Sequence, residues 1–566
     1  MIPDNNQKEE LQEKLFGIKR EEEEKKTEIL AKKFGRPYLN LNILPVDKDD
    51  LSILSEESAR EGEAAALKKT GRVLHLGVRD PENEKTKKII EDLKKQGYEL
   101  KVFVVSFSGL NRIWEKYKLI APEAVSLRGV FNIQENELRE FEKSLETIQK
   151  LKEAITDLPT TNLLATIVAG AIKMNASDIH FEPTKNDLRL RYRIDGVLQD
   201  AAKLSQKQYF FLLSRIKNLS DLLLNVKDIG QDGRFTIKIT GKEKRAIDVR
   251  VSVLPSNHGE TIVMRLLGTS AAKLNLDKLG MEPEMFEAIK TQINQPNGMI
   301  LSTGPTGSGK TTTLYACLNY VNKPGIKIIT VENPIEYQLE GITQTQVEEK
   351  SGYIFAGALR SIVRQDPDVL MVGEIRDKDS AEIAVQFSLT GHIVFSTLHT
   401  NDAVGAVPRL IGMGVEPSSL SSSLKIVVAQ RLVRQLCQGC KKEIKPPKEI
   451  LESVNKIISS LPKNSGIKIP DQISFYESKG CPQCHGLGYQ GRTGIFEIMA
   501  VDKKIEKLIL NKATSYQLFD QAVANGMVTL VQDAVIKAAR GITSLEEVEG
   551  VVGSLKVAAE KTKTPH

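Results

Sequence analysis

The sequence predicts a multidomain α/β protein whose C-terminal half is built on a parallel sheet. Two observations carry this prediction. The chain has 566 residues, whereas one domain typically has about 100–200, so three or four domains are expected. After residue 273, short apolar runs typical of buried strands alternate with helical segments, which is the pattern of a parallel sheet covered by helices.

The first part of the chain, residues 1–133, is expected to form a separate α/β N-terminal domain. The runs RVLHLGV (72–78) and ELKVFVV (99–105) are typical of short buried strands, and the segment between them is typical of a helix. Residues 134–157 carry apolar side chains at helical spacing among charged ones, which predicts a helical linker.

Residues 158–270 are predicted to form a small α+β domain. An apolar helical segment is followed by runs such as LRLRYRIDGVL and RAIDVRVSVLP, in which apolar and polar side chains alternate. Alternation with a period of two is typical of antiparallel strands that expose one face. The P-loop domain, residues 271–566, follows, and the hinge between these two domains is expected at residues 268–273.

The composition excludes several classes of protein. Lys and Arg (79) exceed Asp and Glu (73) by only six, which does not favour a nucleic-acid binder. No apolar run approaches the roughly 18–20 residues needed to span a bilayer. The N-terminal segment MIPDNNQKEELQEK lacks the apolar core of a signal peptide, so a cytoplasmic location is expected.

One segment fits the phosphate-binding motif GxxxxGK[ST]. It follows the apolar run GMILST and precedes a segment compatible with a helix, which is the context that the motif requires. The glycines let consecutive backbone N–H groups surround a phosphate, the lysine reaches the β- and γ-phosphates, and the hydroxyl after it binds Mg²⁺. The expected ATP-binding residues are Gly304, Pro305, Thr306, Gly307, Ser308, Gly309, Lys310, Thr311 and Thr312.

Hydrolysis of ATP also requires carboxylates that hold Mg²⁺ and orient water. Glu332 and Glu336 lie at the end of one apolar run, and Glu374 follows another at residues 369–372. Because parallel strands end at the edge of the sheet where ligands bind, both segments are expected beside the phosphate loop. A single acidic residue after a strand is usually a helix cap or a surface group, but two such strands after a phosphate loop favour a catalytic pair.

Four cysteines form two CxxC pairs, Cys437 with Cys440 and Cys481 with Cys484. Four thiolates satisfy the tetrahedral coordination of Zn²⁺ and leave no open position for catalysis, so we expect a structural zinc module over residues 437–484. The alternative of haem attachment at CPQCH would require export, and a redox dithiol would not need the second pair.

Together these motifs resemble the secretion ATPases that power type II secretion and type IV pilus assembly. The phosphate loop GPTGSGKTTT is followed in order by TVENPIEY, DPDVLMVGEIRD and LTGHIVFSTLHTNDA, and it is preceded by ASDIHFEP, RYRIDGVL, QDGR and DVRVSVLP. The resemblance covers residues 158–550 strongly and the first domain weakly. It implies a RecA-like fold for the P-loop domain, a PAS-like fold for the small domain, and ATP, Mg²⁺ and structural Zn²⁺ as ligands.

The resemblance also implies roles for single residues. Glu336 resembles the catalytic glutamate that polarises the attacking water, and Glu374 resembles the Walker B glutamate that acts on Mg²⁺. His399 resembles the histidine that lies near the γ-phosphate. Arg234 and Arg250 match arginines that reach the phosphates when the small domain closes over ATP, and an arginine fork suits the charged oxygens of a phosphoryl group.

The chain departs from the family at Asn333, where the family usually has Asp. Asn keeps a hydrogen-bonding side chain but loses the negative charge. Hydrolysis is still expected, at the same or a lower rate, because Glu332, Glu336 and Glu374 remain. Arg360 and Arg364 lie four residues apart and therefore share one helix face, where they are candidates for the phosphates or for a subunit interface.

By this resemblance the chain is expected to be a homohexameric motor, peripherally associated with the inner face of the cytoplasmic membrane. Its expected partners are an inner-membrane platform protein and cytoplasmic parts of the pilus or secretion complex, and no direct binding of nucleic acid is expected. The tetracysteine site resembles that of the assembly ATPases and not the retraction ATPases. Two alternatives remain: a DNA-uptake pseudopilus motor, and a nucleotide-binding scaffold with weak hydrolysis, which Asn333 suggests.

Overall fold

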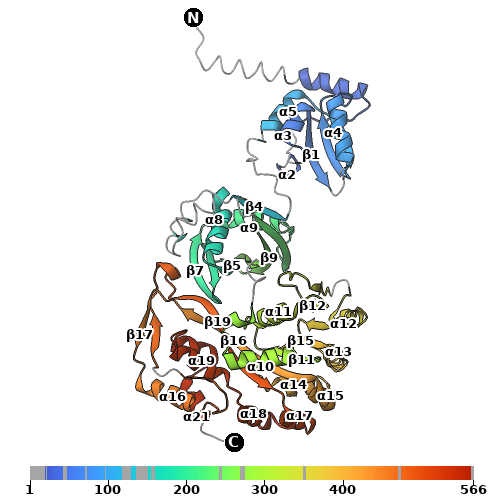
Figure 1. Cartoon of the computed structure of the whole chain (residues 1–566). Helices are drawn as coiled ribbons and strands as arrows, with labels where there is room; N and C mark the ends of the chain where they lie inside the picture. The colour runs from blue at the N-terminus through green and yellow to red at the C-terminus, as the bar shows by residue number, and fades with distance from the viewer. Residues whose placement is uncertain are drawn as a thin grey trace. The chain divides into compact units, whose positions relative to one another are not determined.

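A computed structural model describes the protein at residues 20, 22–41, 48–51, 53–70, 73–95, 97–115, 117, 129–134, 151–152, 155, 160–240, 245–267, 275–348, 352–469 and 473–561. By its internal contacts the chain divides into two compact units, Met1–Ser126 and Leu127–His566 (Figure 1).

The N-terminal unit contains a three-stranded sheet in the order β1-β2-β3. The strand β1 pairs antiparallel with β2, and β2 pairs parallel with β3 through a crossover that contains α4. Leu74, Leu76 and Trp114 lie in its buried core. The elements are α2 (Lys48–Leu51), α3 (Glu56–Glu61), β1 (Ala64–Thr70), β2 (Val73–Val78), α4 (Glu84–Lys95), β3 (Glu99–Val104) and α5 (Phe107–Trp114).

The second unit begins with a seven-stranded sheet in the order β4-β8-β9-β10-β5-β6-β7. All of its pairs are antiparallel except β4 with β8. Two helices, α8 (Thr160–Lys173) and α9 (Gln206–Leu219), pack their apolar side chains against it. The strands are β4 (Val130–Gln134), β5 (Ala176–Pro183), β6 (Leu188–Ile194), β7 (Val197–Leu204), β8 (Gln231–Thr240), β9 (Arg245–Ser256) and β10 (Gly259–Leu267).

A second seven-stranded sheet, in the order β13-β12-β14-β15-β11-β16-β19, forms the P-loop domain. Its pairs are parallel except for the antiparallel pair of β16 with β19. Every residue of β11, β12, β14 and β15 is buried, which is why the sequences of these strands are largely apolar. The strands are β11 (Gly298–Thr303), β12 (Ile328–Glu332), β13 (Thr343–Gln346), β14 (Val369–Val372), β15 (Ile393–Leu398), β16 (Leu424–Leu436) and β19 (Tyr489–Ala500).

Helices cover this sheet, and a two-stranded ribbon of β17 (Lys441–Ile444) and β18 (Phe475–Ser478) extends from it. The helices are α10 (Pro283–Ile293), α11 (Lys310–Val321), α12 (Phe355–Val363), α13 (Lys378–Leu389), α14 (Ala406–Gly412), α15 (Pro417–Ser423), α16 (Lys448–Ser459), α17 (Lys503–Leu510), α18 (Ser515–Ala524), α19 (Leu530–Ala539), α20 (Leu545–Val552) and α21 (Leu555–Lys561).

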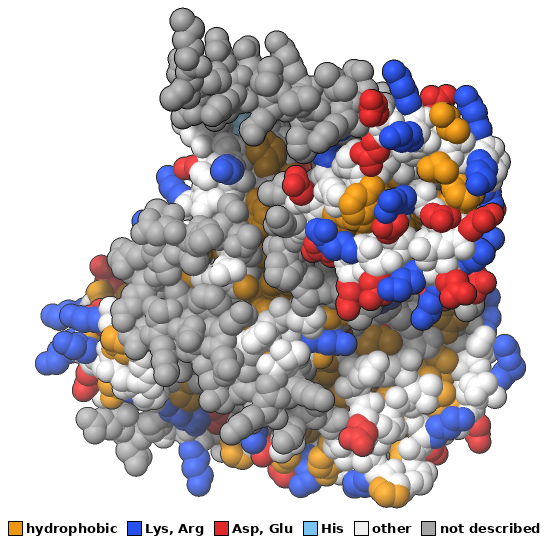
Figure 2. Space-filling view, turned by 90° about the horizontal axis from the view of Figure 1, so that it is seen from above, with side chains coloured by type: hydrophobic (Ala, Val, Ile, Leu, Met, Phe, Trp, Pro, Cys, Tyr) orange, Lys and Arg blue, Asp and Glu red, His pale blue; other side chains and the backbone are white. Residues whose placement is uncertain are grey.

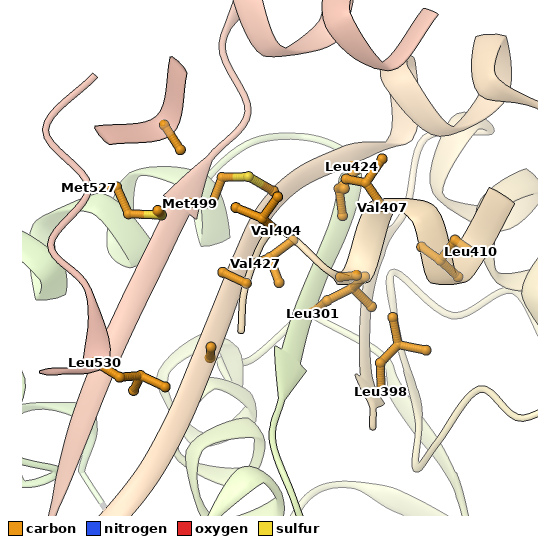
Figure 3. Close-up of a cluster of buried hydrophobic side chains, with 14 of the residues drawn as sticks. Leu301, Leu398, Val404, Val407, Leu410, Leu424, Val427, Met499, Met527 and Leu530 are labelled. Carbon is orange, nitrogen blue, oxygen red and sulfur yellow. The ribbon is translucent and has the colours of Figure 1, made fainter. Parts of the chain in front are cut away.

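The largest core of the P-loop domain lies between its sheet and these helices. Figure 3 shows Leu301 of β11, Leu398 of β15 and Val427 of β16 in one cluster with Val407 and Leu410 of α14. Each of these side chains is buried. Burial of apolar surface of this kind holds the central strands in place and so fixes the loops at their ends.

Some expected boundaries differ from the structure or fall outside it. The strand β4 begins within the range 1–133 but pairs with β8 of the second unit, so the break between the units precedes it. Most of the expected linker, 134–157, lies outside the described residues, although Leu151 and Ile155 are buried in the core of the small domain. The expected hinge at 268–273 also lies outside them.

Candidate nucleotide site and cysteine cluster

The phosphate loop joins the end of β11 to the start of α11. Gly304, Gly307 and Gly309 have φ angles of 147°, 79° and 91°, a region that side chains disfavour. A Cβ atom on Gly304 would lie 2.6 Å from the carbonyl oxygen of Gln430, and one on Gly309 would lie 2.7 Å from the Nε2 atom of Gln430. The loop therefore lies directly on β16, and only glycine fits at these two positions.

Lys310 is buried at the start of α11, and its Nζ atom folds back onto the loop. It donates hydrogen bonds to the carbonyl oxygens of Gly304 (2.8 Å) and Pro305 (3.1 Å). Burial lowers the pKa of Lys310, the carboxylate of Glu374 opposes this shift, and Arg431 adds to it. A buried ammonium held only by neutral carbonyls is poised to bind an anion such as a phosphate.

Two buried polar atoms beside the loop have no hydrogen-bond partner among the described residues, Ser308 Oγ and Arg431 Nη1. Arg431 lies on β16, and its Nη2 atom donates to the carbonyl oxygen of Asn401 (3.2 Å). An unpaired hydroxyl and an unpaired guanidinium nitrogen next to Lys310 fit a site built for an anionic ligand.

The other predicted residues of the loop lie where the motif requires them. Thr306 is exposed at the tip of the loop, and Thr311 and Thr312 lie half-buried in the first turn of α11. The residue after them, Thr313, donates to Gln430 Oε1 at 2.6 Å and so ties α11 to β16. Thr311 therefore remains partly accessible at the start of α11.

Glu374 and His399 meet at the carboxyl edge of the sheet. Glu374 lies two residues after β14, and His399 directly follows the neighbouring parallel strand β15. The Nε2 atom of His399 lies 3.6 Å from Glu374 Oε2, and Arg376 forms a 2.5 Å ion pair with Glu374 Oε1. The carboxylate of Glu374 is therefore held from both sides beside the phosphate loop.

The two glutamates at the end of β12 have different surroundings. Glu332 is buried, and its carboxylate accepts hydrogen bonds from Tyr315, from Thr330 (2.5 Å) and from Gln344 (3.2 Å). Because these three donors occupy it, the carboxylate of Glu332 has little capacity left to bind a ligand. Its role is to hold the end of β12 in place. Glu336 is half-buried in the loop that follows, where its carboxylate is accessible.

Arg250 of the small domain reaches this loop. Its Nη1 atom lies 3.7 Å from Glu336 Oε2, and its Nη2 atom donates to the carbonyl oxygen of Ile335 at 2.6 Å. Arg234 of β8 lies directly opposite Arg250 of β9 in the strand register, and its side chain is exposed. Like charges directly opposite each other destabilise a strand pair, so this pair also favours an anion nearby.

Arg360 and Asn333, which the sequence singled out, and the neighbouring motif residue His392 lie apart from this cluster. Arg360 pairs with Asp379 at 3.3 Å, and both side chains are largely exposed. His392, at the opposite end of β15, stacks on Phe387 with ring centroids 3.9 Å apart. Asn333 follows β12 and is exposed.

The four cysteines converge on one point. The Sγ atoms of Cys437 and Cys481 lie 3.8 Å apart, as do those of Cys440 and Cys484, and 3.7 Å separates Cys481 from Cys484. Zinc–sulfur bonds of about 2.3 Å in a tetrahedron place the sulfurs about 3.8 Å apart, whereas a disulfide holds them at about 2.05 Å. The cluster therefore fits a metal ion and not a pair of disulfides.

The thiols of the cluster differ in acidity. Burial favours the neutral thiol of Cys484, but hydrogen bonds from the backbone N–H groups of Cys481 and Gly488 dominate and lower its pKa to about 7. Burial, assisted by the neighbouring thiols, raises the pKa of Cys440 to about 12. A thiolate already stabilised at Cys484 favours metal binding, because metal ligands must be deprotonated.

The sequence motifs and this geometry agree with comparison to known proteins. The model of the "Type II/IV secretion system protein" family matches residues 153–550. The chain belongs to this family. A second model, the MshEN domain, matches residues 34–122.

Relatives of this secretion-family chain cover most of its length. A type IV pilus assembly ATPase, PilB, of Myxococcus xanthus is 39% identical over 94% of this chain and 91% of the relative. A type II secretion system ATPase E of Vibrio cholerae is 44% identical over 77% of this chain and 84% of the relative. The solved structure of the ATPase DotB of Legionella pneumophila has a TM-score of 0.51 at 19% identity, over 69% of this chain and 96% of DotB, and supports the fold.

Sequence reasoning gave no role to several residues of this site. Gln430 and Arg431 lie on β16, more than a hundred residues after the phosphate loop, and only the pairing of β16 with β11 brings them under it. Asp178 and Arg265 of the small domain lie on the same row of residues as Arg250. The available signal was weak, because Asp178 lies in the motif ASDIHFEP but one acidic residue in a strand indicates no function.

No helix in the described part of this secretion-family chain is both long and apolar enough to cross a bilayer.

Proposed function

We propose that this protein is a Mg²⁺-dependent ATPase that works as a homohexameric motor for type IV pilus assembly or type II protein secretion. It would act at the inner face of the cytoplasmic membrane, on an inner-membrane platform protein and the cytoplasmic parts of the same complex. The observation that carries the proposal is the cluster at one sheet edge: the phosphate loop, Glu374 with His399, and Glu336 with Arg250. Kinship with pilus assembly and secretion ATPases supports the choice of process.

In this proposal the phosphate loop and Lys310 bind the phosphates of ATP. Lys310 Nζ exchanges its carbonyl partners in the loop for phosphate oxygens, which are better acceptors for an ammonium group. The hydroxyl of Thr311 and the carboxylate of Glu374 would hold Mg²⁺. When bound, Mg²⁺ neutralises charge that develops on the phosphoryl oxygens.

Glu336 is the proposed residue that orients and polarises the attacking water. It is suited to this role because its carboxylate is accessible, whereas Glu332 is occupied by three donors. Arg250 and Arg234 of the small domain would stabilise the transferring phosphoryl group, as arginines do in related phosphoryl-transfer sites. His399, which contacts Glu374, would sense the γ-phosphate.

The direct test measures phosphate release from the purified full chain with Mg²⁺ and ATP. Lys310→Ala is expected to abolish turnover, and Lys512→Ala, at an exposed helix–helix connection, is the control. A wild-type chain that binds ATP but releases no phosphate would support the scaffold alternative. Glu374→Gln trapped with ATP in its native cells would then identify the membrane partners by co-purification and mass spectrometry.

A further inference from the structure

The segment that follows the cysteine module, residues 485–491, contacts the small domain. The backbone N–H of Gly491, at the start of β19, donates a hydrogen bond to Asp195 Oδ2 at 2.8 Å. Asp195 lies in the tight turn between β6 and β7. Leu487, three residues after the last cysteine, packs against the core of the small domain. We call the hydrogen bond and the Leu487 packing the turn contact.

A bulge in β19 frees the donor of this contact. Arg434 pairs with Arg492 and Leu436 pairs with Tyr489, so two residues of β19 oppose the single residue Gln435. Gly491 is one of the two, and its φ of 78° is a conformation that glycine adopts readily. A bulged residue leaves the strand ladder, so its N–H group can point to another partner.

The cysteines hold the segment that carries the turn contact. The N–H of Gly488 donates to Cys484 Sγ at 3.1 Å, and its carbonyl oxygen accepts from the N–H of Cys437 at 2.9 Å. The N–H of Gly486 donates to the carbonyl oxygen of Cys481 at 2.8 Å. A metal ion that fixes the four sulfurs would therefore also fix the loop on which Leu487 lies.

The β6–β7 turn is also linked to the arginines of the small domain. Arg193 Nη1 donates to the carbonyl oxygen of Gly196 at 3.0 Å, and Arg193 Nε lies 3.3 Å from Asp178 Oδ2. Asp178 is buried, and its Oδ1 atom accepts from Arg265 Nε at 2.8 Å. Arg265 lies directly opposite Arg250 in the pairing of β10 with β9.

We propose that the segment after the last cysteine positions the small domain over the nucleotide site through the turn contact, and that Asp195 is the residue of the small domain that receives it. Asp195 is a positioning residue in this scheme, since it touches no reacting atom. The turn contact, Arg193, Asp178 and Arg265 form one continuous set of bonds and strand pairs that ends beside Arg250. The effect on turnover rests on the proposed ATPase function, whereas the contact itself does not.

The first experiment measures the contact without any ATP. Hydrogen exchange of the full, zinc-loaded chain is expected to show a protected Gly491 amide in the wild type and in Asp195→Asn, which keeps an oxygen acceptor. In Asp195→Gly the amide is expected to exchange at least about 10-fold faster, because its acceptor is gone. Glycine tolerates the φ of 48° at this position, so the substitution adds no backbone strain.

The second experiment removes the metal. Chelation of zinc from the wild type is expected to increase exchange at residues 487–491 and in the β6–β7 hairpin, while β11 stays protected and shows that the P-loop domain remains folded. Leu487→Ala in the zinc-loaded chain is a second variant that weakens the turn contact without touching a cysteine. Unchanged exchange in the hairpin after both changes would overturn the proposal.

The third experiment measures ATP turnover. Asp195→Gly is expected to lower kcat about 5-fold with a KM change of less than about 2-fold, and Asp195→Asn is expected to restore it. Chelation should lower wild-type kcat to a similar extent. It should have little further effect on Asp195→Gly, because both changes break the same turn contact. Lys512→Gly, at an exposed residue with φ 52°, controls for glycine itself. If chelation and Asp195→Gly lowered kcat by independent factors that multiply, the proposed coupling between the cysteines and the turn contact would be overturned. A wild type with no turnover would overturn the proposed function alone.

Discussion

Arg250 of the small domain contacts Glu336 of the P-loop domain, with Nη1 3.7 Å from Oε2, while its Nη2 binds the neighbouring carbonyl oxygen of Ile335 at 2.6 Å. This pair joins the two residues to which we assign phosphate stabilisation and water activation. In the proposed function, a phosphate group would compete with Glu336 for the same guanidinium, so ATP binding would transfer Arg250 from the glutamate to the phosphates. The carboxylate of Glu336 would then be free to accept a hydrogen bond from water.

Arg250→Lys is expected to lower kcat about 100-fold, because a lysine cannot contact two oxygen acceptors with one planar fork. Arg189→Ala is the matched control from the same sheet, because its ion pair with Asp200 lies at the surface and such pairs contribute little to stability. Steady-state phosphate release at saturating ATP makes the measurement. Equal rates of phosphate release for Arg250→Lys and the control would show that Arg250 does not contribute to hydrolysis.

Glu336→Gln is expected to lower kcat by about 10²-fold or more while the affinity for ATP stays within about 3-fold, because general-base assistance is lost but the phosphate loop is intact. Fluorescent-nucleotide binding and single-turnover hydrolysis separate the two quantities. Glu340→Gln, an exposed residue of the same loop, is the control. A loss of binding equal to the loss of turnover would contradict the role in catalysis.

Glu332→Gln is expected to act on stability, because the carboxylate holds Tyr315, Thr330 and Gln344 together in the interior. The change replaces acceptor capacity with a donor and leaves at least one of these groups poorly paired, at a cost of about 1–3 kcal/mol. Thermal unfolding followed with and without ATP gives the readout. A kcat defect at an unchanged melting temperature would instead place Glu332 in the reaction.

Cys484→Ser is expected to abolish zinc binding in the purified chain, since the sulfur spacing of the cluster requires all four ligands. Cys317→Ala is the control, because Cys317 is buried in the helix after the phosphate loop and is remote from the cluster in the chain. Elemental analysis of both proteins after gel filtration decides the point. If Cys484→Ser kept zinc at the wild-type ratio, the zinc would have to bind at a site other than this cysteine cluster.

Stability is expected to depend on Glu497 between pH 4.5 and pH 7. Burial raises the pKa of its carboxyl to about 7 from an ordinary value near 4.5, against the N–H groups of Ala403 and Leu530 that bind it. The folded state therefore binds a proton more tightly than the unfolded state. The stabilisation is complete below pH 4.5 and is lost as the pH rises to about 7, a change of about 3 kcal/mol.

Glu497→Gln removes this titration. Denaturant midpoints of the variant and the wild type, measured from pH 5 to pH 8, are expected to diverge in favour of the variant as the pH rises. A constant difference across this range would show that Glu497 does not titrate there.

Local sequence was sufficient for the phosphate loop and for the strands beside it. The glycines of residues 304–309 require φ angles that other residues disfavour, and the largely apolar runs of β11, β14 and β15 suit strands buried on both faces. The paired CxxC spacing likewise indicated the metal cluster, because each pair brings two thiols onto one turn. The extent of β4 was not predictable in this way, since a short strand joins whichever sheet its partner occupies.

The sequence by itself determined which groups are available: a phosphate loop, acidic residues at strand ends, arginines in an alternating strand, and four cysteines. Only the tertiary structure decided which of them act together. Strand pairing places Gln430 under the phosphate loop and Arg234 opposite Arg250, and side-chain packing occupies Glu332 while it leaves Glu336 accessible. The physical reason is that local motifs follow from backbone preferences, whereas long-range contacts depend on register and burial across the whole sheet.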